Sequence, residues 1–218
     1  MNLFLIIFSL LLSKHPAKKD TISTTAIVDG VFYKAVVNND QSVSIKLNSG
    51  KEVFHIDSKD LDSEEFAKLE FSDFNGDGYK DLLIRYRSNV PDISDLILFN
   101  KNTRRFVKVK DFEDYPDPKR IPNTSLYYSY HRSGCSDNNW DSDLFKIIDF
   151  HVVKLGNISA NACDDEAPKG IFIYKINRSS EKLIKKLSIQ APDGYNDTKW
   201  GFIAHYWKSN YKKFIKSN

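Results

Sequence analysis

The sequence lacks most of the features that would place it in an obvious functional class. It has only two cysteines, five histidines and a formal net charge of +3. The histidines, at positions 15, 55, 131, 151 and 205, show no metal-ligand spacing, which argues against a zinc site. The small, dispersed positive charge argues against nucleic acid as a partner. No Gly-rich phosphate loop and no G-x-S-x-G elbow occurs, so no familiar catalytic motif is visible.

Long apolar runs are also absent, apart from LFLIIFSLLL at residues 3–12. This run is about half as long as a membrane-spanning helix needs. It matches the apolar part of a secretory signal peptide, although no Lys or Arg precedes it and no clean A-x-A site follows. The alternative is an uncleaved anchor or a buried strand. We predict a leader at residues 1–19, one domain at residues 20–218, and an exported protein that is periplasmic or secreted.

The two cysteines, Cys135 and Cys163, lie in the polar stretches SGCSDNN and NACDDE. An oxidising compartment would pair them, so export and a Cys135–Cys163 disulfide support each other. The alternatives are two free thiols or a catalytic Cys135 assisted by His131. On an extended strand, four positions separate two residues by about 13 Å, which disfavours the catalytic pair.

Most of the chain reads as short strands separated by turns. It contains 15 Phe and 11 Tyr, a bias that favours strands over helices. Strands are predicted at residues 21–28, 31–37, 42–47, 51–56, 95–100, 105–110, 126–131, 144–154, 170–177 and 183–190. The spacing predicts a mainly β fold, an antiparallel meander that resembles part of a β-propeller.

Two segments depart from this pattern. A helix-start signal, Asp62 or Ser63 before two glutamates, predicts a short helix near residues 62–68. Apolar residues spaced by three or four predict a C-terminal helix near residues 198–216, with Asp197 as a plausible N-cap. We expect that helix to pack on the β core; the alternative is a basic surface helix that contacts anionic lipid. Beyond the leader, we expect no contact with the membrane.

The most informative stretch is DFNGDGYKD, residues 73–81, which lies between two predicted strands. Oxygen-bearing groups recur at every second position, and a hard cation such as Ca²⁺ binds several oxygens of this kind. The predicted ligands are Asp73, Asn75, Asp77, the backbone of Tyr79, and Asp81. Gly76 and Gly78 allow the tight turn that this requires. The alternative is a polar turn held by Asx hydrogen bonds without a metal.

An EF-hand is excluded, because its twelfth loop position needs a Glu and here that position is Ile84. The flanking segments LEFSD and DLLIRYR also read as strands. The loop instead resembles the strand–loop–strand calcium site of FG-GAP and VCBS repeats, over about sixteen residues. With the hairpin DLILFNKNTRRF and the segment YYSYHRSGCSDNNWDSDLFKI, the chain resembles small bacterial periplasmic proteins with a partial propeller. Some of those inhibit lysozyme-like effectors, which implies a protein partner such as a cell-wall hydrolase.

A second acidic group, Asp137, Asp141 and Asp143, lies between Cys135 and the predicted strand at residues 144–154. These carboxylates could form a second cation site or an acid–base pair; the alternative is a polar loop tied down by Cys135. We therefore expect a non-enzymatic, calcium-stabilised module that binds a protein partner or a surface glycan. The alternative is an exported hydrolase that acts on glycan or peptidoglycan through the acidic residues 137–143.

Overall fold

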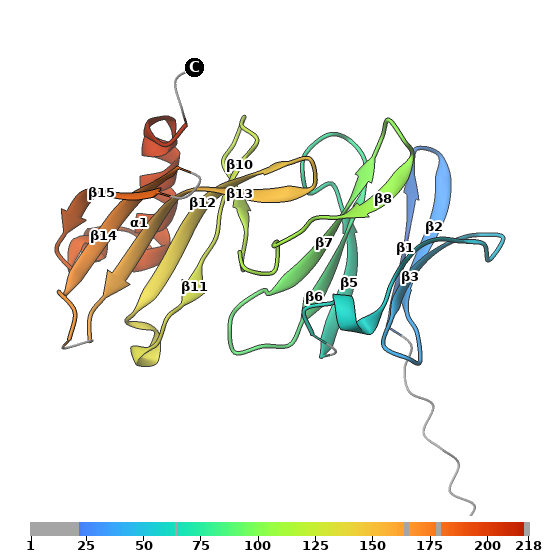
Figure 1. Cartoon of the computed structure of the whole chain (residues 1–218), viewed down its shortest axis with the longest axis horizontal. Coiled ribbons are helices and arrows are strands. Elements are labelled where there is room, and N and C mark those ends of the chain that lie inside the picture. Colours follow the sequence, from blue (N-terminus) through green and yellow to red (C-terminus); the bar gives the residue numbers. More distant parts are fainter. Residues whose placement is uncertain (1–21, 64, 164–165, 178–179, 216–218) are drawn as a thin grey trace, which may run out of the picture.

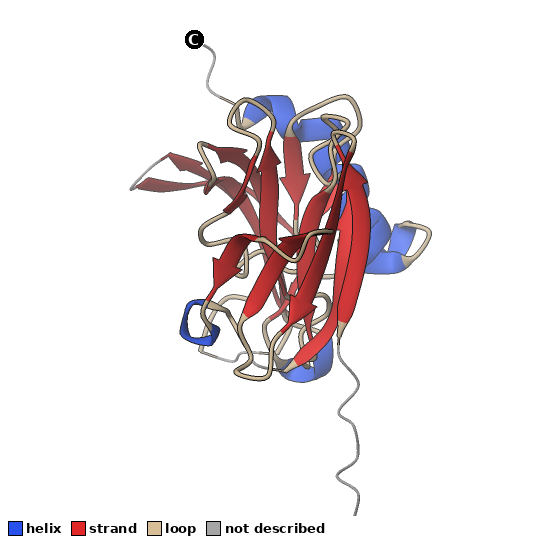
Figure 2. Cartoon of the chain, turned by 90° about the vertical axis from the view of Figure 1, so that its right-hand side faces the viewer, coloured by secondary structure: helices blue, strands red, loops and turns tan. Residues whose placement is uncertain are grey.

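A computed structural model describes residues 22–63, 65–163, 166–177 and 180–215, so the predicted leader lies outside the described residues. Three antiparallel sheets follow one another along the chain and lie side by side (Figure 1). Strands are the main regular structure of the described residues, and the one α-helix among them lies near the C-terminus (Figure 2). The prediction of a mainly β, antiparallel meander is confirmed.

The first and second sheets are four-stranded meanders whose strands pair in chain order. The first contains β1 (Ser23–Val28), β2 (Val31–Val37), β3 (Val43–Leu47) and β4 (Glu52–Ile56). The second contains β5 (Phe66–Ser72), β6 (Asp81–Tyr86), β7 (Ser94–Asn100) and β8 (Arg105–Lys108). One apolar core joins them, and the rings of Tyr33 and Phe106 meet in it at a centroid distance of 5.2 Å.

The third sheet is larger, and its strands pair in the order β15-β14-β13-β12-β10-β9, while β11 pairs with β12. Its strands are β9 (Lys119–Arg120), β10 (Leu126–Tyr128), β11 (His131–Arg132), β12 (Trp140–Ile148), β13 (His151–Asn161), β14 (Gly170–Asn177) and β15 (Ser180–Leu187). A second apolar core, which includes Leu96, Phe112 and Phe145, joins it to the second sheet.

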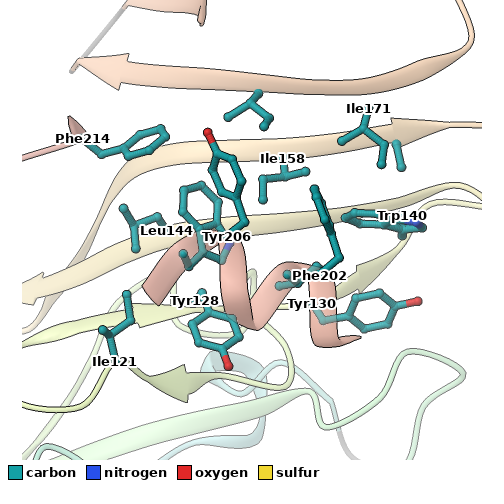
Figure 3. Close-up of a cluster of buried hydrophobic side chains, with 14 of the residues drawn as sticks. Ile121, Tyr128, Tyr130, Trp140, Leu144, Ile158, Ile171, Phe202, Tyr206 and Phe214 are labelled. Carbon is teal, nitrogen blue, oxygen red and sulfur yellow. The ribbon is translucent and has the colours of Figure 1, made fainter. Parts of the chain in front are cut away.

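Helix α1 (Thr198–Asn210) covers one face of the third sheet, as predicted. Its side chains Phe202 and Tyr206 point at the strand residues (Figure 3), and Trp207 is fully buried beside them. The α-helix ends six residues before the predicted limit of 216, because residues 211–213 tighten into a 3₁₀ turn. Asp197 precedes the helix with a φ of 64° but makes no side-chain capping bond. No helix among the described residues is long and apolar enough to cross a membrane.

Two expectations about local structure are wrong. Instead of a helix near 62–68, the chain forms a 3₁₀ turn at Ser58–Asp60 and enters β5 at Phe66. Phe66 pairs with Tyr86 and both rings are buried, so sheet packing overrides the local helix signal.

The strand predicted at 144–154 is two strands, β12 and β13, which turn at Asp149 and Phe150. Both of these residues have positive φ, as a tight hairpin turn requires.

Candidate functional site

The loop at residues 73–81 connects β5 to β6, as the sequence predicts. Gly76 and Gly78 have φ values of +72° and +92°, a region that L-residues with side chains rarely adopt. The two glycines therefore permit the tight turn that joins the antiparallel strands β5 and β6. This is the local geometry that gathers alternate side chains on the inside of a turn.

Hydrogen bonds show that the loop oxygens converge. Asp73 Oδ1 and Asn75 Oδ1 both lie 3.0 Å from the Asp77 backbone nitrogen, which donates to both. Gly78 N donates to Asp73 Oδ2, and Tyr79 N donates to Asp77 Oδ1, each at 3.0 Å. The first three predicted ligands thus meet within one turn, in the Asx-bonded form that the metal-free interpretation also describes.

Asp81 behaves differently from the other loop carboxylates. It is fully buried, and its two oxygens accept bonds from Phe74 N at 3.0 Å and Phe99 N at 2.9 Å. Burial raises the pKa of Asp81 to about 7, and the nearby Asp77 carboxylate contributes to the rise. Asp81 therefore ties the loop to β7 across the sheet.

Arg120 of the third sheet reaches over this loop. A Cβ placed on Gly76 would lie 1.7 Å from Arg120 Nη1, so the guanidinium occupies the space above the turn. Arg120 also donates from Nε to the Thr124 carbonyl, which holds its side chain in place. This contact could not be predicted from local sequence, because Arg120 lies in a different sheet.

The donor set of the loop fits calcium. Each carboxylate oxygen that accepts one N–H bond retains a further lone pair, so Asp73 and Asp77 can both accept N–H bonds and coordinate a cation. Carboxylate, amide and backbone oxygens are the ligands that Ca²⁺ prefers. Among the described residues, no group of three or more His, Cys, Asp or Glu side chains is arranged to hold a metal ion. A calcium ion here would thus depend on Asn75 and the backbone of Tyr79 as well as on carboxylates.

The cysteines form a disulfide, as predicted. Cys135 and Cys163 are bonded, with their Cα atoms 6.2 Å apart. The bond links the loop before β12 to the end of β13. No free cysteine is found among the described residues, so the catalytic-thiol alternative has no support from the structure.

Asp137 lies beside the disulfide on the helix side of the third sheet. Lys199 Nζ, from α1, lies 2.5 Å from Asp137 Oδ2, and Tyr130 donates its hydroxyl to Asp137 Oδ1. Burial opposes ionisation of Asp137, but the Lys199 and Tyr130 bonds outweigh it and lower the pKa. Asp137 therefore anchors the disulfide-bonded loop to the helix.

Asp141 and Asp143 lie on the other face of the sheet, so the structure does not bring the three carboxylates together. Asp143 accepts from Asn157 Nδ2 at 2.8 Å and pairs with Lys154 Nζ at 2.7 Å. Burial raises the pKa of Asp143 against the lowering effect of Lys154. Asp141 has no hydrogen-bond or ion-pair partner among the residues described.

A further buried carboxylate was not recognised in the sequence. Asp95 is fully buried in β7, accepts a 2.5 Å bond from the Tyr86 hydroxyl and pairs with Lys108 Nζ at 2.9 Å. The signal was a single Asp inside the apolar run SDLILF, opposite a strand that carries a Lys. The Asp62 backbone nitrogen also donates to Asp95 Oδ2 at 3.3 Å, so Asp95 joins several segments of the fold and has a structural role.

A comparison with protein families matched none of them, and a comparison with curated proteins found no match. Among solved structures, the chain is similar to a Xanthomonas type IV secretion system related protein. The two share 14% sequence identity, the match covers 75% of this chain and 93% of the other, and the TM-score is 0.49.

Proposed function

We propose that the protein is an exported binding module whose fold is stabilised by calcium at residues 73–81. It holds a partner and does not transform a substrate. The partner is a protein, such as a peptidoglycan hydrolase, or a glycan of the cell surface. The disulfide Cys135–Cys163 supports export, because such bonds persist in oxidising compartments.

The observation that carries the proposal is the convergence of Asp73 Oδ1 and Asn75 Oδ1 on one backbone nitrogen, at 3.0 Å each. A cation in this turn would stiffen a loop that Asp81 already ties to β7. Rigid strands and loops present a preformed surface, which lowers the entropic cost of binding a partner. The buried carboxylates Asp81 and Asp95 both have structural partners, which supports a binding role over a catalytic one.

The calcium part is tested by thermal and urea unfolding with 1 mM calcium or with a chelator. At a dissociation constant typical of extracellular sites, about 10⁻⁴ M, calcium adds about 1.4 kcal/mol to the free energy of unfolding. We expect the chelator and the Asp77→Ala variant each to remove this increment. Asp193→Ala, at an exposed position away from the loop, is the matched control. Equal stability with and without calcium would refute the metal site.

The binding part is tested with a lysozyme-type hydrolase and a suspension of peptidoglycan. The expected result is slower clearing of the suspension when the protein is present, with a saturable dependence on its concentration. A direct affinity measurement with immobilised hydrolase separates inhibition from protection of the substrate. Failure to bind any hydrolase and any glycan tested would contradict a binding role.

One observation favours the hydrolase as a second candidate. Asp141 and Asp143 lie two residues apart on one face of β12, and burial raises the pKa of Asp143. Two neighbouring carboxylates in different environments are the usual basis of acid–base hydrolysis. The test is incubation with peptidoglycan and oligosaccharides. Release of product that is abolished by Asp141→Asn would replace the binding role with a catalytic one.

A further inference from the structure

The third sheet has two faces with different coverings. Helix α1 packs on one face, where Trp140, Ile158 and Ile171 meet it (Figure 3). No helix among the described residues lies on the opposite face (Figure 1). Asp141 and Asp143 lie on that second face, which is only partly exposed, because Tyr115 packs on Phe145 there and Asn157 is buried. The composition of this face can be worked out from the strand register, because directly paired residues of an antiparallel sheet point to the same side.

Two neighbouring rows of side chains cross this face from β11 or β12 to β15, and together they form what we call the open face. The first row is His131, Asp141, Ser159, Phe172 and Lys186. The second row is Asp143, Asn157, Tyr174 and Leu183. With neighbouring strands about 4.8 Å apart, five strands give the first row a length of roughly 19 Å.

Two aromatic rings lie next to each other in the middle of the open face. Phe172 and Tyr174 are two residues apart on β14, and both are partly exposed. Leu183, 48% exposed, lies directly across from Tyr174. Lys186 Nζ lies 5.2 Å from the centre of the Phe172 ring, where it can donate a hydrogen bond beside the ring. The rings thus form a shallow apolar strip with a donor at its end.

Polar groups with free hydrogen-bonding capacity border the strip. His131, Asp141 and Ser159 stand side by side in the first row and are each partly exposed. None of their side chains has a hydrogen-bond or ion-pair partner among the described residues. In the second row, Asn157 and Lys154 hold Asp143 in a fixed orientation. The residues that border the strip therefore provide both hydrogen-bond donors and hydrogen-bond acceptors close to the rings of Phe172 and Tyr174.

We propose that the open face binds a neutral linear oligosaccharide. Aromatic rings present a negative face to the C–H groups of a sugar ring, while carboxylate, hydroxyl and imidazole groups bond to its hydroxyls. Two carboxylates, Asp141 and Asp143, are balanced by two ammonium groups, Lys154 and Lys186. A strongly charged partner would therefore gain little from this face. This inference rests on the proposed binding function and names a glycan as the ligand of this face.

The test is calorimetric titration of the full chain with chitotetraose and with cellotetraose. Phe172→Ala and Tyr174→Ala should each weaken binding by about tenfold or more, which is about 1.4 kcal/mol. Asp141→Ala should weaken it as well, and it is the variant safest for folding because Asp141 has no partner to lose among the described residues. Phe32→Ala is the matched control, since Phe32 is 40% exposed on a strand of the first sheet. It should bind as the unmodified protein does.

The outcomes separate this inference from the proposed function. Absence of binding to both oligosaccharides, or equal affinity in Phe172→Ala and Phe32→Ala, overturns the glycan site. Inhibition of a hydrolase does not depend on the glycan site, so this result alone would support the proposed binding role. Binding followed by release of shorter sugars would keep the site and overturn the non-catalytic role. Binding to an acidic peptide in preference to both sugars would assign the face to a protein partner and overturn the proposal.

Discussion

The second and third sheets are stabilised by different kinds of interaction. In the second, Asp81 and Asp95 are fully buried carboxylates, each held by hydrogen bonds or an ion pair. In the third, the core is an apolar layer between strands and α1 that includes the fully buried Trp207, and a disulfide links the loop before β12 to the chain just after β13. Both sheets bury many apolar side chains, but fully buried carboxylates are found in the second sheet and the disulfide in the third.

Because of this difference, the two sheets should respond differently to pH and to added cations. Polar bonds to a buried carboxylate change with its protonation and with nearby cations. Apolar burial is proportional to area and responds little to pH or ions. Changes of pH, cation concentration and sequence should therefore affect the stability of the two sheets differently.

Trp207→Ala should have the largest effect on stability. The indole is fully buried and donates from Nε1 to Ser142 Oγ at 2.8 Å, so the change leaves a cavity and a buried hydroxyl without this donor. Replacing a buried Trp by Ala costs about 3–5 kcal/mol. Urea unfolding followed by circular dichroism measures it. Trp200→Ala is the control, because Trp200 is 38% exposed on the same helix. Equal losses in both variants would contradict the assigned core.

Removal of the disulfide should have the second-largest effect on the free energy of unfolding. The Cys135→Ala/Cys163→Ala double variant opens a loop with a sequence separation of 28 residues. The chain-entropy estimate for such a loop is a loss of about 3–4 kcal/mol. Reductant should destabilise the unmodified protein by a similar amount and leave the double variant unchanged. Unfolding of the second sheet alone in the double variant would contradict the assignment of this bond to the third sheet.

The pH dependence tests the second sheet directly. Because burial raises the pKa of Asp81 to about 7, the folded protein retains a proton that the unfolded chain releases near pH 4. The contribution of Asp81 to the free energy of unfolding is therefore fully present below about pH 4 and is lost as the pH rises towards 7. The loss amounts to a few kcal/mol, since one pKa unit corresponds to about 1.4 kcal/mol.

This is measured as the difference in unfolding free energy between the unmodified protein and Asp81→Asn, in chelator, across that range. Added calcium should reduce the loss near neutral pH, because a cation favours the ionised carboxylate. A difference that does not vary with pH would show that Asp81 does not titrate in this window.

The smallest effect concerns the contact between the second and third sheets. Gly76→Ala introduces a side chain at a φ of +72°, for which L-residues pay about 1–2 kcal/mol, and it also meets Arg120 Nη1. Gly50→Ala is the matched control, with a φ of +84° and nothing within 4 Å. The excess destabilisation of Gly76→Ala over Gly50→Ala should vanish when Arg120 is also replaced by Ala. An excess that persists would locate the strain in the loop itself.

Local sequence patterns were sufficient for most of the strands. Alternating apolar residues and turn signals predicted the first sheet to within a few residues, because neighbouring strands there pair in chain order. The turn at Asp149 and Phe150 was missed because it contains neither Gly nor Asn, the residues that usually mark positive φ. The helix near 62–68 was wrong because the pairing of Phe66 with Tyr86 outweighs a local capping signal.

The loop at residues 73–81, with its alternating oxygens and its glycine turns, was predictable from the sequence, because it is built by residues that are close neighbours in the chain. The Cys135–Cys163 pair followed from there being only two cysteines. The burial of Asp81, the position of Arg120 over Gly76 and the separation of Asp137 from Asp141 by the sheet required the three-dimensional fold. The physical reason is that burial and strand register depend on segments far apart in the chain, and their pairing places the open face on one side and the helix on the other.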